Sequence, residues 1–98
     1  MARFDVHEIE EGTLVVVCQA ELFDHLDVRF VVPLIPIESA PDAAGRLNPV
    51  IEIDGRRYLA FPQWSGGMPT RTLGQKTANI DSQGLAILNA FDMLISGF

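Results

Sequence analysis

Five side chains in this sequence could in principle carry chemistry: His7, Cys18, Asp24, His25 and Asp27. Catalysis needs a positioned acid, base or nucleophile, and histidine is the commonest acid or base. His7 stands near the end of an expected strand and His25 stands in "FDHLD", and neither has a companion motif. Each is therefore interpreted as a surface histidine or one whose hydrogen bonds are satisfied locally.

The remaining candidates for chemistry also lack the partners that their chemistry requires. The spacing of Asp24, His25 and Asp27 matches none of the zinc or calcium patterns. "WSGGMPTR" lacks the lysine and the following helix of a phosphate loop, so a turn with Trp64 over a barrel edge is expected. Cys18, in the apolar "TLVVVCQA", has no basic partner nearby and is typical of an inert core thiol. We expect a binding domain with no metal, no cofactor and no enzymatic activity.

Composition limits the class of protein further. A chain of 98 residues with 48% apolar residues suits a single domain over residues 1–98. The net charge of -6 argues against direct binding to nucleic acid, because carboxylates repel phosphates. One cysteine excludes an intrachain disulfide, and no apolar run approaches the roughly 20 residues of a membrane span. We expect a soluble, cytoplasmic protein that does not bind membranes.

Hydrophobic patterning predicts a mainly β domain with five to seven short strands. Asp54 and Gly55 suit the positive φ angles of a type I′ turn between two strands. The consecutive valines 15–17 indicate a strand covered on both faces. Pro33 removes a backbone donor and is expected at an edge, an end or a bulge. Strands are expected at residues 3–9, 14–20, 28–35, 50–53, 57–61 and within 70–80, a loop at 62–69, and a polar crossing with a short helical turn at 36–48.

The end of the chain predicts the one helix, over residues 83–95, with Asp81 or Ser82 as its N-cap. Its apolar residues form two stripes, which is more than a single contact with the core requires. We therefore expect the helix to face both its own sheet and a partner. One stripe holds Leu85, Leu88, Phe91 and Ile95, and the other holds Ile87, Ala90 and Leu94.

The order of several segments resembles the CcdB family of toxins over nearly the whole chain. These segments are "RFVVPLI", "LNPVIEIDGRRYLAFPQ", "MPTRTLG" and "AFDMLISGF". The resemblance implies an SH3-like, partly open barrel of antiparallel sheets with one C-terminal α-helix. It also implies a homodimeric toxin of a toxin–antitoxin module that binds the A subunit of DNA gyrase and traps its cleaved-DNA state. A CcdA-like antitoxin with a disordered tail would neutralise it. The anchors are Phe4, Val32-Pro33-Leu34, Pro49-Val50, Pro69, Leu73-Gly74 and Gly97.

The resemblance also assigns residues to the contact with gyrase. It places Leu94 near the dimer axis. The family's tryptophan before the penultimate glycine is replaced by Ser96, and Asp92 stands where the family has a neutral amide. Phe98 stands where the family has an aliphatic residue. The implied contact residues are Leu22, Phe23, Asp92, Ile95, Ser96, Gly97 and Phe98.

Three alternatives remain open at the level of the sequence. The protein could be a CcdB-fold module that acts on another target or serves as an inert antitoxin partner. An enzyme is the weakest alternative, because no catalytic constellation is present. Leu22, Phe23 and Phe98 could also complete the core or a dimer seam rather than contact a target.

Overall fold

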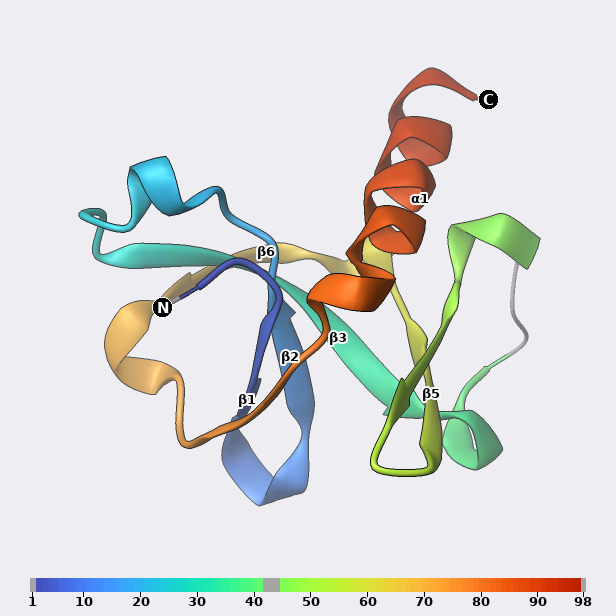
Figure 1. The fold of residues 1–98 in the computed structure, drawn as a ribbon, viewed down its shortest axis with the longest axis horizontal. Helices are drawn as coiled ribbons and strands as arrows, with labels where there is room; N and C mark the ends of the chain where they lie inside the picture. The colour runs from blue at the N-terminus through green and yellow to red at the C-terminus, as the bar shows by residue number, and fades with distance from the viewer. Residues whose placement is uncertain (1, 42–44, 98) are drawn as a thin grey trace.

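A curled antiparallel sheet with one C-terminal helix beside it forms the fold (Figure 1). The computed structural model describes residues 2–41 and 45–97. Strand order in the seven-stranded sheet is β4-β5-β3-β2-β1-β7, with β6 also paired to β3. This confirms the expected mainly β fold class, a partly open barrel with one C-terminal helix. The elements are β1 (Asp5–Glu8), β2 (Leu14–Val17), β3 (Val28–Pro36), β4 (Val50–Ile53), β5 (Arg56–Ala60), β6 (Gly66–Pro69), β7 (Lys76–Asn79) and α1 (Gly84–Ser96).

β2 is buried along its whole length, as its run of valines predicts. It pairs with β1 on one side and with β3 on the other. Val16 belongs to the main core inside the curled sheet, whereas Val15 and Val17 belong to a smaller apolar cluster on the other face. Because successive side chains of a strand point to opposite faces, a continuous apolar run is what two covered faces require.

β3 is the central strand, and the position expected for Pro33 is wrong. Pro33 lies inside this strand opposite Val15, not at an edge, an end or a bulge. The carbonyl of Pro33 accepts a hydrogen bond from the Phe61 N–H at 3.0 Å. A residue in an antiparallel strand directs its N–H and C=O to the same side, so the missing donor also faces this side. There β3 changes partner, because residues 28–31 pair with β6 and residues 34–36 pair with β5.

The β4–β5 hairpin confirms the predicted turn. Asp54 and Gly55 have φ angles of 51° and 80°, as a type I′ turn requires. Ile51 and Ile53 point into the core, and Glu52 between them points to solvent. Among its described residues, the preceding crossing contains two short 3₁₀ turns, η3 (Ile37–Ser39) and η4 (Gly45–Leu47), which confirms the expected helical turn.

The loop expected at residues 62–69 is wrong in its second half, which forms the strand β6. The first half is a 3₁₀ turn, η5 (Pro62–Trp64). Glycine and proline are depleted in strands, so the sequence Gly66-Gly67-Met68-Pro69 gives no strand signal. Pairing with β3 overrides that preference, and a side chain at Gly67 would press against Val28 at 3.0 Å.

The helix begins later than its expected cap. Residues 81–83 form a 3₁₀ turn, η7 (Asp81–Gln83), and Gln83 is the N-cap of α1 without a side-chain capping bond. The Gln83 amide instead donates to the carbonyl of Glu52 and accepts from its N–H, both at 2.8 Å. These two bonds attach the helix start to the outer strand β4 and close the open side of the barrel with a side chain.

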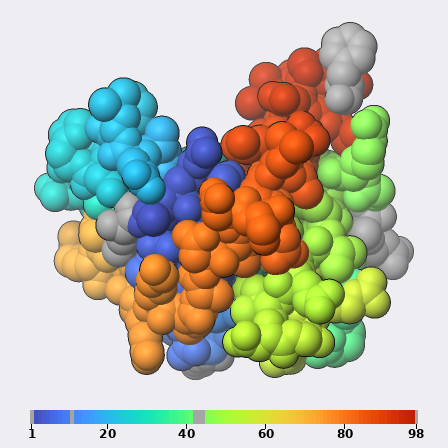
Figure 2. Space-filling model, in the orientation of Figure 1, coloured from blue at the N-terminus to red at the C-terminus, as the bar shows by residue number. Residues whose placement is uncertain are grey.

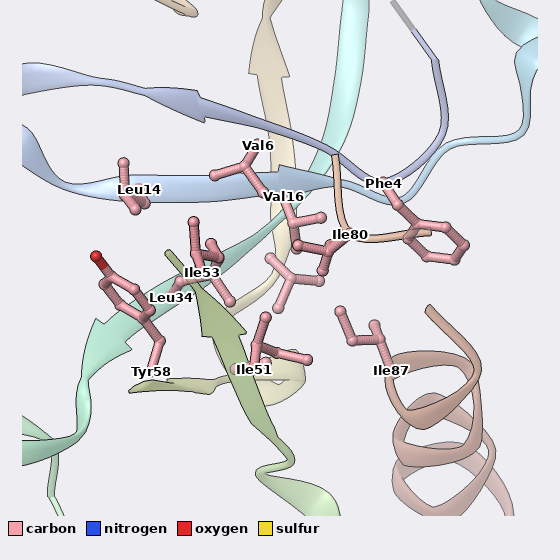
Figure 3. Packing of buried hydrophobic residues seen from close by; sticks show 12 residues of the cluster. Phe4, Val6, Leu14, Val16, Leu34, Ile51, Ile53, Tyr58, Ile80 and Ile87 are labelled. Atoms are coloured by element: carbon pink, nitrogen blue, oxygen red, sulfur yellow. The ribbon is translucent and has the colours of Figure 1, made fainter. Parts of the chain in front are cut away.

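The Phe4 side chain packs against Gly84, the first residue of α1. Phe4 has a φ of 69°, a left-handed conformation that is uncommon outside glycine, and its side chain is buried. A Cβ atom at Gly84 would lie only 2.3 Å from the Phe4 ring, so the ring occupies the space that this glycine leaves. Phe4, Ile80 and Ile87 meet at this end of the core (Figure 3).

Candidate functional site

The loop between β2 and β3 presents apolar side chains to solvent. Its first part is a 3₁₀ turn, η2 (Glu21–Phe23), in which Leu22 is 79% exposed and Phe23 is also exposed. Leu26, further along the loop, is exposed as well. Leu22 and Phe23 therefore do not complete the core of the chain.

The other predicted contact residues lie at the end of α1. Ile95 is 81% exposed, and Ser96 and Gly97 are exposed beside it. The Ser96 hydroxyl donates a hydrogen bond back to the carbonyl of Asp92. Gly97 ends the helix with a φ of 82°, a left-handed cap that glycine adopts without strain. Phe98 lies outside the described residues.

The two apolar stripes of α1 have different surroundings. Ile87 and Ala90 are fully buried, and Ile87 belongs to the main core, whereas Leu85 and Leu88 are exposed. Leu94, expected near a dimer axis, is also exposed. The helix thus covers its own core with one face, and in the second stripe Phe91 is half-buried while Leu85, Leu88 and Ile95 are exposed.

Phe30 and Phe91 link the helix to β3, with ring centroids 5.5 Å apart. The loop and the helix end lie on the same side of the molecule (Figure 1). Figure 2 shows a hollow between them, with the N-terminal segment at its floor. Leu22 and Phe23 therefore lie in one prominence, and Ile95, Ser96 and Gly97 lie in a second at the end of α1, on the other side of the hollow.

Asp92 lies one turn before Ser96 on α1, and the Ser96 hydroxyl bonds to its carbonyl. It lines a groove of about 530 Å³ between α1 and the segment around η4, together with Arg46, Pro49, Ala86, Asn89 and Met93. The structure therefore does not bring the Asp92 carboxylate together with Leu22 and Phe23.

The side chains considered for chemistry are dispersed. His7 is buried, with its Nδ1 3.0 Å from the carbonyl oxygen of Gly74, while His25 is exposed. Burial raises the pKa of the Cys18 thiol to about 12, although the positive charge of Arg3 opposes this, so the thiol stays neutral at pH 7. Over residues 2–41 and 45–97, no three His, Cys, Asp or Glu side chains form a group that could hold a metal ion.

Trp64 packs on the barrel as expected, with its ring stacked on that of Phe61 and the two ring centroids 4.4 Å apart. No helix within the described ranges is long and apolar enough to cross a membrane.

The residues that shape the β2–β3 loop were not predicted from the sequence. Gln19 and Arg29 flank this loop, and both hydrogen-bond to its backbone. The segment "LDVRF" holds a signal for Arg29, because Leu26, Val28 and Phe30 alternate with it. In the structure these three apolar side chains are exposed, while Arg29 is buried. A lone arginine on the buried side of a strand requires backbone or carboxylate partners nearby.

Comparison with known proteins identifies a family whose model covers nearly the whole chain. The model of the family described as CcdB protein matches residues 3–97. The match spans every strand and α1, and includes all the predicted contact residues except Phe98. No curated protein sequence matches the chain.

Proposed function

The chain belongs to the CcdB family, and on this premise we propose that it is the toxin of a type II toxin–antitoxin module. It binds the A subunit of DNA gyrase and traps the cleavage complex. The observation that carries this proposal is the exposure of Leu22 and Ile95, at 79% and 81% the highest of the large apolar side chains that the structure describes. Both stand in the segments that the family uses for its target.

These side chains can contribute substantial binding energy. Burying a leucine or isoleucine side chain that was exposed is worth about 1.5–3 kcal/mol. A loss of about 1.4 kcal/mol weakens an equilibrium constant tenfold. Leu22→Ala and Ile95→Ala should therefore each weaken gyrase binding by about tenfold, with little change in thermal stability because neither residue is in the core.

The test combines supercoiling inhibition, cleavage-complex formation and binding to the purified A subunit. Ile37→Ala is the matched control, because Ile37 is an exposed apolar residue in η3, at the opposite end of the sheet from the loop and the helix end. If the control weakens inhibition as much as Leu22→Ala does, the proposed contact surface is wrong. If the wild-type protein neither binds nor inhibits gyrase, the gyrase assignment fails.

A second candidate function is a CcdB-fold protein with a different target. It is favoured by Ser96, whose hydroxyl bonds back to the helix and offers no apolar surface where the family has tryptophan. Ser96→Trp should strengthen gyrase inhibition if only this anchor is missing, and melting temperature should not change because Ser96 is exposed. If the wild type arrests growth while Ser96→Trp still leaves gyrase active, another target is indicated.

The proposed partners are a second copy of the chain and a CcdA-like antitoxin. The exposed stripe with Leu85 and Leu88, and Leu94 at the exposed end of the other stripe, support a homodimer, since a helix apolar on two faces usually packs on two surfaces. Sedimentation should show a dimer at micromolar concentration, and a monomer would contradict this. Inducible expression with and without the neighbouring gene tests the antitoxin, which should restore growth.

A further inference from the structure

Two polar side chains at the ends of β2 and β3 hold the backbone of the loop that carries Leu22 and Phe23. Gln19 donates from Nε2 to the carbonyl of Phe23 at 2.7 Å. Its Oε1 accepts from the Phe30 N–H at 3.0 Å. One amide therefore ties the last residue of η2 to the strand that follows the loop.

Arg29 holds the same loop from the other side. Its guanidinium donates to the carbonyl of Asp24 at 2.7 Å and also to the carbonyl of Leu26. The Asp24 carboxylate lies 3.9 Å from the Arg29 Nε, which gives a weaker ionic contact. The positive charge thus uses backbone carbonyls of the loop as its main acceptors.

Because Arg29 is buried, its guanidinium depends on one conformation of the loop for its hydrogen bonds. Arg29 is only 6% exposed. Burying a charge is costly unless hydrogen bonds compensate for lost water, and here the loop carbonyls accept from the two terminal nitrogens, while Nε has no hydrogen-bond partner. Any other loop conformation would leave the guanidinium with fewer acceptors. Arg29 therefore penalises alternative conformations of the loop.

We propose that Gln19 and Arg29 are positioning residues that hold the 20–27 loop in one conformation, so that Leu22 and Phe23 are presented to the target already ordered. This rests on the proposed function for the identity of the target. A rigid apolar tip loses less conformational entropy on binding. If the loop held this conformation only a tenth of the time, the apparent affinity would fall about tenfold.

Gln19→Glu tests the proposal with almost no change in shape. Glutamate keeps the acceptor for Phe30 but places a carboxylate oxygen against the Phe23 carbonyl. Gln19 is partly exposed, so the fold should survive. Gln75→Glu is the matched control, because Gln75 is exposed before β7 and the charge change is the same.

Arg29→Met and Arg29→Lys form the second pair. Methionine fills similar space without donors, and lysine restores part of the donor set, so it should recover part of the lost function if donation to the loop is what matters. Should Arg29→Met fail to fold, Gln19→Glu and Arg29→Lys still decide the question.

Loop order is measured without the target, by amide hydrogen exchange. The N–H groups of Phe23, Asp24 and Leu26 donate within the loop at 3.0, 3.0 and 3.2 Å. We expect their exchange to be at least about tenfold faster in Gln19→Glu and Arg29→Met than in the wild type. In Gln19→Glu, the exchange of the core amides and the melting temperature should match those of the wild type. In the Gln75→Glu control, the loop amides should also exchange at the wild-type rate.

Target binding is measured with the purified A subunit of DNA gyrase. Gln19→Glu should bind about tenfold more weakly, through a lower rate of productive association. Unchanged loop exchange, or faster exchange with unchanged affinity, overturns the positioning role. If the wild type does not bind gyrase, the proposed function fails, while the exchange measurement still decides whether these residues order the loop.

Discussion

Replacing Gly84 by alanine should destabilise the protein, although alanine is normally the better helix former. In the structure a Cβ at this position would lie 2.3 Å from Cε2 of Phe4 and 2.6 Å from two more ring atoms. Ordinary contacts begin at 3.4 Å, so the ring would have to retreat by about 1 Å. Phe4 cannot do this freely, because it is buried and its backbone is held in a left-handed conformation.

The size of the effect follows from two opposing terms. Overpacking of a core site costs about 1–3 kcal/mol, and alanine recovers at most about 1 kcal/mol of helix propensity over glycine. Because the 2.3 Å approach is so close, the cost should lie in the upper part of that range, about 2–3 kcal/mol, and the net loss should be about 1–2 kcal/mol. For a domain of this size that corresponds to a melting temperature lower by roughly 4–16 °C. Thermal unfolding followed by circular dichroism measures it directly.

Two further variants show whether the Phe4 contact is responsible. Gly66→Ala is the control, because nothing lies within 4 Å of a Cβ there and its φ is not positive. Phe4→Leu removes the ring, so adding Gly84→Ala to it should cost clearly less than in the wild type. A Gly84→Ala protein as stable as the wild type would refute the account of how the helix is seated.

Three other measurements test the electrostatics and closure of the fold. Burial raises the pKa of Asp5, but hydrogen bonds led by that from the Asn79 amide outweigh it and leave this pKa below its ordinary 3.8. The stabilisation that the ionised Asp5 carboxylate gives to the fold is therefore fully present above pH 3.8 and is lost as the pH falls further. In urea unfolding, the loss in free energy of unfolding caused by Asp5→Asn should therefore be smaller at pH 3 than at pH 7. The Cys18 thiol, with its pKa raised by burial to about 12, should react slowly with a disulfide reagent at pH 8 and quickly once urea unfolds the chain. Gln83→Ala removes both bonds to the Glu52 backbone and should cost about 1 kcal/mol, lowering the melting temperature by roughly 4–8 °C; an unchanged value would show that these bonds do not close the barrel.

The strands with a strong local signal could be predicted, and those that depend on tertiary pairing could not. The Asp54-Gly55 turn and the valines of β2 follow from backbone preference and side-chain periodicity. β6 has no such pattern, and it forms because residues 28–31 of β3 pair with it. Pro33 fits inside a central strand only because β3 changes partner there, which no local pattern reports.

The contact surface divides in the same way. An apolar loop with Leu22 and Phe23 could be identified as unusual from residue types alone, and their exposure supports a binding role. The bonds of Gln19 and Arg29 to that loop depend on two strand ends meeting across it, so the sequence did not predict them. The helix start was misplaced because Gln83 bonds to β4 rather than capping α1.

The pairing of β1 with β7 has a consequence for synthesis of the protein. Asp5 and Asn79, joined by a side-chain hydrogen bond, are 74 residues apart, and the core also needs Ile87 from the helix. Contacts this distant in sequence form late and slow folding. A nascent chain in which Asn79 and Ile87 have not yet emerged from the ribosome lacks these contacts, so we expect it to remain unfolded until they emerge. On the proposed function, toxic activity would then appear only after these residues have emerged, which gives a binding partner already present in the cell time to engage it.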